Sequence, residues 1–351
     1  MKNRNDVIDV FRGIAVLLVT SFHIFLWSSS NGKPLTGHWD TYGPFGNGWV
    51  GVGIFFVISG YCMGMSTNRA FSHGVSKSSY TVYFSKRFLR IAIPYYISIL
   101  FWVILIKNYG IAVKPTGVYD VLSHALFFHN LNENTMFSIS GVYWSLAVEM
   151  QFYILLPFIV YFCKTPNKKI VLLVACAAIS MLINLTSNDR VLTWSLASYL
   201  YLFILGWFLF SYSDCAINNA FLNFIKTLSV VAFILMLFYK GSGFNNNIKI
   251  YELIVSTLAG VMMWSFIVGS HKHKPRLIVK VISFIGKCSF SIYLYNYIFW
   301  ALPRGDVSPA FAIMSYFVVI SFGVIMYFIV EVPSEKFRKS IFRDITKALT
   351  T

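Results

Sequence analysis

The chain has 351 residues, of which 57% are hydrophobic and only 12% are charged, and its mean hydropathy is +0.66. Soluble domains carry roughly 25% charged residues, so this composition argues against a soluble globular enzyme. The 29 Lys and Arg residues against 13 Asp and Glu residues give a formal net charge of +16. In a membrane protein such an excess reflects topology more often than a nucleic-acid partner, and we expect no nucleic-acid partner.

Long apolar runs, separated by Pro, Gly, Asn and charged residues, predict an all-α polytopic membrane helix bundle of about ten transmembrane helices. The segment 119–129 is apolar but too short to span, so we interpret it as interfacial or re-entrant. No internal repeat supports the inverted-repeat architecture of many transporters. The expected spans are 8–28, 47–66, 88–107, 141–163, 169–186, 193–212, 221–239, 250–269, 280–301 and 309–330.

The distribution of cations predicts that both termini are cytoplasmic, because most Lys and Arg residues then fall on the cytosolic side. A cleaved signal peptide is the alternative for the first apolar stretch. It is disfavoured because Arg12 and His23 interrupt the stretch and no A-x-A cleavage site follows. Only seven cations fall on the outer side: Lys33, Lys107, Lys114, Arg190, Lys240, Lys249 and Arg304.

The five cysteines show neither a CxxC pair nor zinc-ligand spacing, so we expect no disulfide framework, no metal site and no tightly bound cofactor. Gly60 and Gly64 have the small-xxx-small spacing that lets membrane helices approach closely, and we interpret both as packing residues.

Arg12 and His23 are the first ionisable pair inside a span. They are eleven residues apart, which places them on one helix face and about 16 Å apart along the axis. A histidine at this depth suits proton transfer near neutral pH. The structural alternatives are that Arg12 reaches to lipid headgroups and that His23 bonds a neighbouring helix.

Glu149 lies roughly 12 Å below the outer end of the fourth span, at a depth similar to that of His23. We therefore expect the two side chains to meet in the bundle interior, where a carboxylate would stabilise the charged imidazole. The alternative is a structural Glu149 that bonds Ser145 one turn away.

Three cations, Lys86, Arg87 and Arg90, fall within about one helical turn in "SKRFLR", at the expected cytosolic mouth of the third span. Arginine is well shaped for bidentate phosphate contacts. Taken alone, the cluster is weak evidence for a phosphate site, because most such clusters are positively charged flanks of membrane spans.

Six motifs in this order resemble the acyltransferase 3 family of integral membrane acyltransferases, and together they cover essentially the whole chain. Any one of them is degenerate, but six in register make chance similarity improbable. They are "VIDVFRGIAVLLVTSFH" (7–23), "GVGIFFVISGY" (51–61), "KRFLRIAIPYY" (86–96), "YWSLAVEMQFYILLP" (143–157), "FSIYLYN" (290–296) and "VEVP" (330–333).

The resemblance implies a bacterial inner-membrane enzyme that moves an acyl group, usually acetyl, from cytosolic acyl-CoA to a carbohydrate hydroxyl on the outer side. The family pattern of an arginine and a histidine separated by ten residues matches Arg12 and His23. The family's Arg-x-x-Arg motif matches Arg87 and Arg90, and its glutamate in the Trp-Ser-Leu segment matches Glu149. Among family acceptors we favour lipopolysaccharide O-antigen or a similar exopolysaccharide.

This chain departs from the family pattern at two positions: Gly53 stands where many members have Asp, and Asn296 where many have His. We expect neither change to touch the chemical residues. The expected division is a transmembrane acyltransferase domain, 1–333, and a basic cytosolic tail, 334–351. In some relatives a periplasmic esterase-like domain follows the last span, so an acyl relay, where one is needed, would use a separate periplasmic partner.

The mechanism we expect places acyl-CoA on the cytosolic side, with Lys86, Arg87 and Arg90 on its phosphates and Arg12 deeper in the bundle. His23 then acts as the general base on the sugar hydroxyl, while Glu149 supports the imidazolium. This hypothesis requires that the His23 ring face a cavity continuous with the cytosolic mouth.

The sequence does not identify an oxyanion donor. Trp144, Ser145 and Tyr153 are candidates to line the oxyanion or acceptor site, because they lie near Glu149 on one helix. A covalent acyl-Ser or acyl-His intermediate stays open. The alternative function is a secondary transporter or exporter of a polar lipid-linked saccharide, in which the buried ionisable residues form a substrate or proton path.

Overall fold

The structure, a computed structural model, describes residues 6–28, 46–72, 74–112, 114–239, 246–269, 276–301 and 309–348. Within these ranges all regular structure is helical, and nine helices are long and apolar enough to cross a membrane. The predicted all-α membrane bundle is therefore confirmed. Three of the cations used to orient the chain, Lys33, Lys240 and Arg304, lie outside the described residues.

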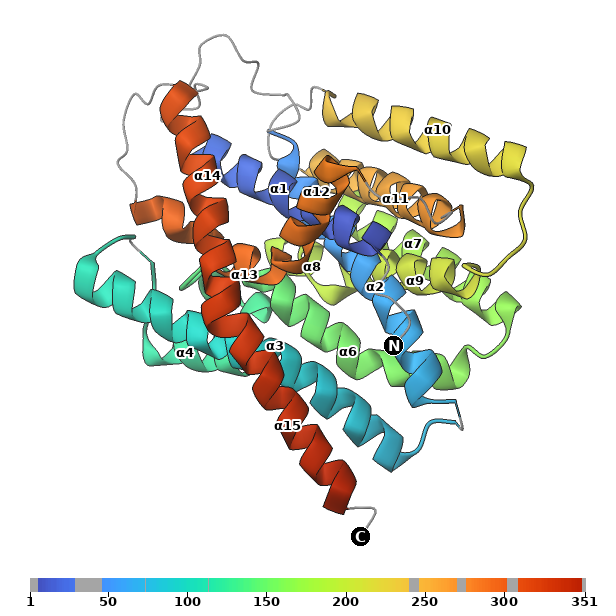
Figure 1. The fold of residues 1–351 in the computed structure, drawn as a ribbon, viewed down its shortest axis with the longest axis horizontal. Coiled ribbons are helices and arrows are strands. Elements are labelled where there is room, and N and C mark those ends of the chain that lie inside the picture. The colour runs from blue at the N-terminus through green and yellow to red at the C-terminus, as the bar shows by residue number, and fades with distance from the viewer. Residues whose placement is uncertain are drawn as a thin grey trace.

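Five of the long helices, α1, α3, α6, α9 and α11, pack against α2, which lies near the middle of the bundle (Figure 1). By contrast, α7, α10 and α14 expose most of their apolar surface, as expected for helices that face lipid. The long helices are α1 (Asp6–Ser28), α2 (Gly51–Ala70), α3 (Lys77–Tyr109), α6 (Trp144–Phe162), α7 (Pro166–Thr186), α9 (Leu196–Ser211), α10 (Asn219–Leu237), α11 (Asn246–Val268) and α14 (Pro309–Met326).

Glycines set the close approach of α2 and α9. A Cβ atom on Gly60 would lie 2.0 Å from the Phe203 carbonyl oxygen, and one on Gly206 would lie 2.0 Å from the Val57 carbonyl oxygen. A Cβ atom on Gly64 would likewise clash with the Phe210 ring. The interpretation of Gly60 and Gly64 as packing residues is therefore correct, since a larger residue would force the helices apart.

The expected span 280–301 is not one continuous helix. It consists of α12 (Leu277–Lys287), α13 (Ser289–Leu294) and a 3-10 turn (Asn296–Ala301). α12 packs so closely on α1 that a Cβ atom on Gly286 would lie 1.7 Å from the Asp9 carbonyl oxygen. The break falls at Cys288, directly before two serines whose side chains bond polar residues of neighbouring helices. These polar contacts explain why the helix changes direction here.

Two other helices are longer than predicted. α3 begins eleven residues before the expected start at 88, because Ser76 and Ser79 form a capping box at its N-terminus. The last span continues beyond 330 through a π-helical turn (Tyr327–Glu331) into α15 (Val332–Ala348). Pro333 does not end the helix because it lies in the first turn of α15, where a missing N–H is tolerated.

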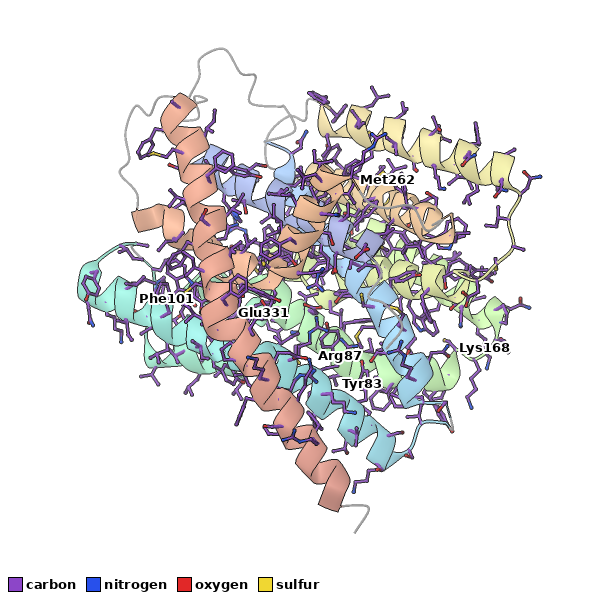
Figure 2. The ribbon with its side chains drawn as sticks, in the orientation of Figure 1. Tyr83, Arg87, Phe101, Lys168, Met262 and Glu331 are labelled. Atoms are coloured by element: carbon purple, nitrogen blue, oxygen red, sulfur yellow. The ribbon has the colours of Figure 1, made fainter. Side chains whose placement is uncertain are left out.

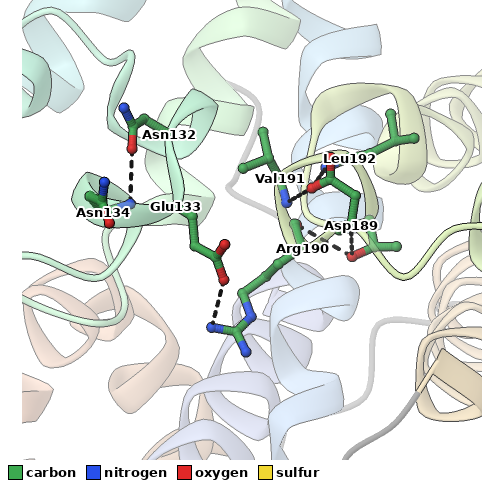
Figure 3. A network of polar contacts seen from close by, with 8 residues as sticks. Asn132, Glu133, Asn134, Asp189, Arg190, Val191 and Leu192 are labelled. Atoms are coloured by element: carbon green, nitrogen blue, oxygen red, sulfur yellow. Dashed lines mark hydrogen bonds and ion pairs between the residues drawn. The ribbon is translucent and has the colours of Figure 1, made fainter.

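Short helices connect the spans on one side of the bundle. α5 (Glu133–Met136) and α8 (Arg190–Thr193) are joined by an exposed ion pair between Glu133 and Arg190, 3.2 Å apart (Figure 3). Asp189 caps α8 by accepting hydrogen bonds from the backbone N–H groups of Val191 and Leu192. Exposed ion pairs contribute little stability, so the cap and the apolar packing matter more here.

Lys249 is not a loop cation as the sequence suggested. It is buried, its ammonium group lies 3.8 Å from the centroid of the Trp194 ring, and it bonds the Tyr199 hydroxyl. That hydroxyl in turn donates to Glu252 at 2.8 Å. The bundle therefore accommodates this charge with a carboxylate and aromatic faces.

The segment expected to be interfacial or re-entrant forms α4 (Val118–Ala125) and a 3-10 turn (His129–Leu131), both too short to span. His124 and His129 stack in parallel with ring centroids 3.9 Å apart, and both are fully buried. Burial lowers the pKa of His124 to about 4 and that of His129 to about 3. Both rings are therefore neutral at pH 7.

This pair predicts an acid-sensitive fold. Because the folded-state pKa values lie below the unfolded value near 6.5, stability is full above about pH 6.5 and falls as the pH drops toward 4. We expect the free energy of unfolding of the purified protein, measured by thermal unfolding, to fall by roughly 1–2 kcal/mol per histidine between pH 7.5 and pH 5. His129→Gln should flatten this dependence, and an identical acid response in the variant would show that the pair is not responsible.

Candidate active site

A cavity of about 110 Å³ opens between α1, α2, α3, α6, α13 and the π-helical turn. The charged residues of its wall are three arginines and two glutamates: Arg12, Arg87, Arg90, Glu149 and Glu331. In Figure 2, Arg87 and Glu331 lie near the middle of the bundle, where α3 and the continuous α14–α15 helix cross. An excess of guanidinium groups in an otherwise apolar bundle suits a ligand with several negative charges.

Two arginines on α3 face this cavity together. Arg87 and Arg90 are three residues apart, so they lie on neighbouring turns of one helix face. Arg90 lies deep among protein atoms, yet its surface is accessible to solvent. This combination is expected for a side chain that borders an open cavity. The start of α3 at Lys77 places both arginines well inside the helix, where packing fixes their direction.

Lys86 does not belong to this cluster, contrary to the prediction. Its ammonium group lies 5.5 Å from the Phe342 ring of α15, and its backbone carbonyl accepts a hydrogen bond from Arg338. The helical repeat alone does not separate Lys86, which projects within about 40° of Arg90. Its long side chain instead turns toward α15, so it is absent from the cavity wall.

Arg12 reaches the cavity from α1 and is held by the broken span. Its Nε donates to the Ser289 hydroxyl at 3.3 Å, directly after the break between α12 and α13. The guanidinium is therefore directed inward, toward the cavity, and not only to the lipid surface.

Glu149 has two hydroxyl partners in the cavity wall. Ser59 of α2 and Tyr153, one turn further along α6, both donate to its Oε1, and the two hydroxyl oxygens are 3.2 Å apart. The structural alternative, a bond between Glu149 and Ser145, is absent among these contacts. Ser145 instead contacts the Tyr293 hydroxyl at 2.6 Å, at the end of the cavity away from Arg87.

The three candidates for an oxyanion or acceptor lining separate into two groups. Ser145 and Tyr153 line the cavity. Trp144 is buried outside it, with its ring 4.5 Å from that of Trp194 and 5.5 Å from the Lys249 ammonium. Trp144 therefore has a packing role next to the buried lysine.

His23 does not line this cavity, and the expected contact with Glu149 is not present. The requirement that the His23 ring face the cavity of the arginines is therefore not met in this structure. The His23 ring lies beside the Asn296 side chain, with the Tyr297 ring 5.3 Å away edge-on and the Phe299 ring stacked at 6.1 Å. The reason is the broken span: Tyr293 lines the cavity, whereas Asn296, Tyr297 and Phe299 of the turn that follows contact His23. Equal depth along two helices did not guarantee contact, because a third segment lies between them.

Arg12 and His23 nevertheless share one face of α1, as their spacing predicted. Both face the broken span, Arg12 at Ser289 and His23 at Asn296. Asn296 also donates to Thr20 at 2.9 Å. The expectation that the unusual Asn296 leaves the chemical residues untouched is therefore wrong, because it lies against His23.

The other departure from the family pattern lies away from the cavity. A Cβ atom on Gly53 would lie 2.2 Å from the Ser256 hydroxyl oxygen of α11, so no aspartate fits there without movement. α2 and α11 are therefore closer at this point than a carboxylate would allow.

Sequence reasoning missed four hydroxyl or carboxyl residues of the cavity wall, Ser59, Ser289, Tyr293 and Glu331. Three of them, Ser59, Tyr293 and Glu331, belong to the quoted motifs "GVGIFFVISGY", "FSIYLYN" and "VEVP". The motifs gave a signal, but only the packing of the helices shows that all three meet at one cavity.

Comparisons with known proteins agree with these motifs. The family model of the acyltransferase 3 family, described as an acyltransferase domain, matches residues 5–333. The peptidoglycan O-acetyltransferase OatA of Listeria monocytogenes is 25% identical over 327 residues, which cover 83% of this chain and 48% of that protein. The putative acetyltransferase ORF330 of Acidianus two-tailed virus is 25% identical over 300 residues, covering 84% of this chain and 83% of that protein.

A third relative, the putative peptidoglycan O-acetyltransferase YrhL of Bacillus subtilis, is 28% identical over 192 residues, covering 50% of this chain and 27% of that protein. The chain thus spans about half the length of OatA. No solved structure matches the chain. Because the family model covers nearly all of the sequence, the chain belongs to the acyltransferase 3 family.

Proposed function

We propose that this protein is a membrane O-acyltransferase that takes an acyl group, most simply acetyl, from cytosolic acyl-CoA and transfers it to a carbohydrate hydroxyl across the membrane. The observation that carries the proposal is the cavity, in which Arg12, Arg87 and Arg90 surround a half-buried Glu149 inside a bundle of this family. CoA carries a diphosphate and a 3′-phosphate. The planar guanidinium group of arginine can form two parallel hydrogen bonds to such phosphate groups.

The proposal assumes that both termini are cytoplasmic. The donor would then enter from the side of Arg87 and Arg90. A cavity of about 110 Å³ is smaller than the roughly 300–1,000 Å³ of pockets that enclose drug-sized ligands. We therefore place the nucleotide phosphates at the mouth, near Arg87 and Arg90. The narrow pantetheine arm would pass Arg12 and Glu149 and carry the thioester toward Tyr293.

The proposed base is His23. It would take the proton from the sugar hydroxyl, the oxygen would attack the thioester carbonyl, and CoA would leave as the thiolate. In this structure the turn from Tyr293 to Tyr297 separates His23 from the donor cavity, so the turn must shift when both substrates are bound. Tyr293 holds the closed arrangement by donating to the Val142 carbonyl at 2.8 Å.

Glu149 acts at the donor end in this proposal. Because Ser59 and Tyr153 both bond it, its role is to organise the cavity around the thioester arm. In the covalent alternative, Ser59 would be the acyl carrier, since it is a serine of the cavity wall bonded to a carboxylate. A pre-steady-state burst of CoA release with acceptor omitted would indicate that route.

The acceptor is proposed to be an extracytoplasmic polysaccharide. Lipopolysaccharide O-antigen or exopolysaccharide is our sequence-based preference, and the names of OatA and YrhL add peptidoglycan as a candidate. Mass spectrometry of each glycan fraction from cells with and without the gene identifies the acceptor, because only the true one loses an acyl mass.

His23→Gln tests the proposed chemistry. We expect acyl transfer to the glycan to fall by at least about a hundredfold, as for loss of a general base, while membrane abundance and acyl-CoA binding stay unchanged. Glycan mass spectrometry and quantitative blotting measure the two effects. Full activity in the variant would remove His23 as the base. Movement of unmodified saccharide without any acyl transfer would favour the alternative, a secondary transporter or exporter.

Arg87→Ala and Arg90→Ala test the donor site. Loss of one charge-assisted phosphate contact should weaken acyl-CoA binding by roughly tenfold or more in each variant. Lys86→Ala is the matched control, because Lys86 is the cation next to Arg87 in sequence but contacts α15 instead of the cavity. Calorimetry on purified protein measures the dissociation constants. Equal weakening in all three variants would return the cluster to a purely topological role.

A further inference from the structure

Glu331 is a carboxylate of the cavity wall that the proposed chemistry does not use. It is the last residue of the π-helical turn between α14 and α15, and it is half-buried. π-helical turns are rare and frequently occur at functional sites, because the extra residue in the turn redirects a side chain. Here the turn presents Glu331 to the cavity.

The surroundings of Glu331 are positively charged. Both Arg12 and Arg90 interact electrostatically with its carboxylate, from α1 and α3 respectively. The next carboxylate along the helix, Glu335, pairs within α15 with Arg338 at 2.7 Å and Lys339 at 3.4 Å, and it also interacts electrostatically with Arg90. Of these two carboxylates, only Glu331 lines the cavity.

The break in the expected span 280–301 holds this arrangement. Ser289 accepts from Arg12 at 3.3 Å, and Ser291 donates to Glu331 at 2.6 Å. Because both serines belong to α13, one short helix fixes the cation and the carboxylate relative to each other. This contact gives a physical role to "VEVP", the motif that the proposed function leaves unexplained, and a second role to "FSIYLYN".

We propose that Glu331 is a resident anion that offsets the charge of Arg12 and Arg90 in the cavity and competes with the phosphates of the CoA moiety for Arg90. It is a positioning residue and not a catalytic one, because it acts through the arginines. The inference rests on the proposed function, since it assumes that Arg90 meets CoA phosphates.

The physical reason concerns product release. CoA keeps all its phosphates after transfer, so arginines that bind the donor bind the product equally well. A carboxylate beside those arginines weakens both complexes and lets CoA leave. The cavity wall, with three arginines and two glutamates, retains a positive excess that still attracts the donor.

The test compares Glu331→Gln with the wild-type protein, both full length and purified in lipid nanodiscs. Removing the charge should tighten CoA binding by roughly tenfold, as expected for a charge a few ångströms away in a partly screened site. The kcat with acetyl-CoA should fall because release slows. With acetyl-pantetheine, a donor without phosphates, KM and kcat should change less than about twofold.

Two further variants separate charge from structure. Ser291→Ala removes a hydrogen bond to Glu331 but keeps the charge, so CoA affinity should stay within about threefold of wild type. Should Glu331→Gln fold poorly, Glu331→Asp withdraws the charge from the arginines, and a smaller tightening of CoA binding is expected.

Unchanged or weaker CoA binding in both Glu331 variants would overturn the inference. An equal response to acetyl-CoA and acetyl-pantetheine would do the same, because it would show an effect that does not act through phosphates. Failure of the wild-type protein to transfer an acyl group from any donor would instead refute the proposed function. The CoA dissociation constants do not depend on turnover, so the two failures are distinguishable.

Discussion

The structure depends on how a largely apolar bundle accommodates three guanidinium groups. A buried charge without a partner costs several kcal/mol, so each arginine must meet a polar group, a carboxylate or a cavity. Arg12 has Ser289, Arg90 interacts with Glu331, and Arg87 borders the same cavity. The break between α12 and α13 and the π-helical turn follow from this requirement, because both bring side-chain oxygen atoms to positions that a straight helix would not reach.

Much of this arrangement could be predicted from sequence, because hydropathy and helical periodicity are local properties. The positions of most spans and the shared face of Arg12 and His23 follow from runs of apolar residues and from about 100° of rotation per residue. Contacts between helices are not local. His23 and Glu149 lie at similar depths, yet Tyr293 and the turn after it occupy the space between them. Lys86 shows the same limit, since it shares a cluster with Arg87 but contacts α15.

Two misjudged helix ends have identifiable causes. Hydropathy placed the start of α3 at its first strongly apolar residues, whereas Ser76 and Ser79 start it eleven residues earlier through a polar capping box. The last span was expected to end at 330, although Pro333 in the first turn of α15 is compatible with continuation of the helix. In both cases the deciding interaction involves backbone groups, which hydropathy does not measure.

The separation of His23 from the donor cavity has a consequence for the proposed acyl transfer. A route that stayed open from Arg87 to His23 would let water reach the thioester and would let ions cross the membrane. Tyr293 closes the route with its contacts to Ser145 and the Val142 carbonyl, and it belongs to the same short helix, α13, that holds Arg12 and Glu331. In the proposed mechanism, donor binding at the arginines and opening toward His23 would therefore be linked through α13. Since a short helix bounded by a break and a 3-10 turn moves at lower cost than a continuous span, the broken helix suits this task better than the straight one that hydropathy predicts.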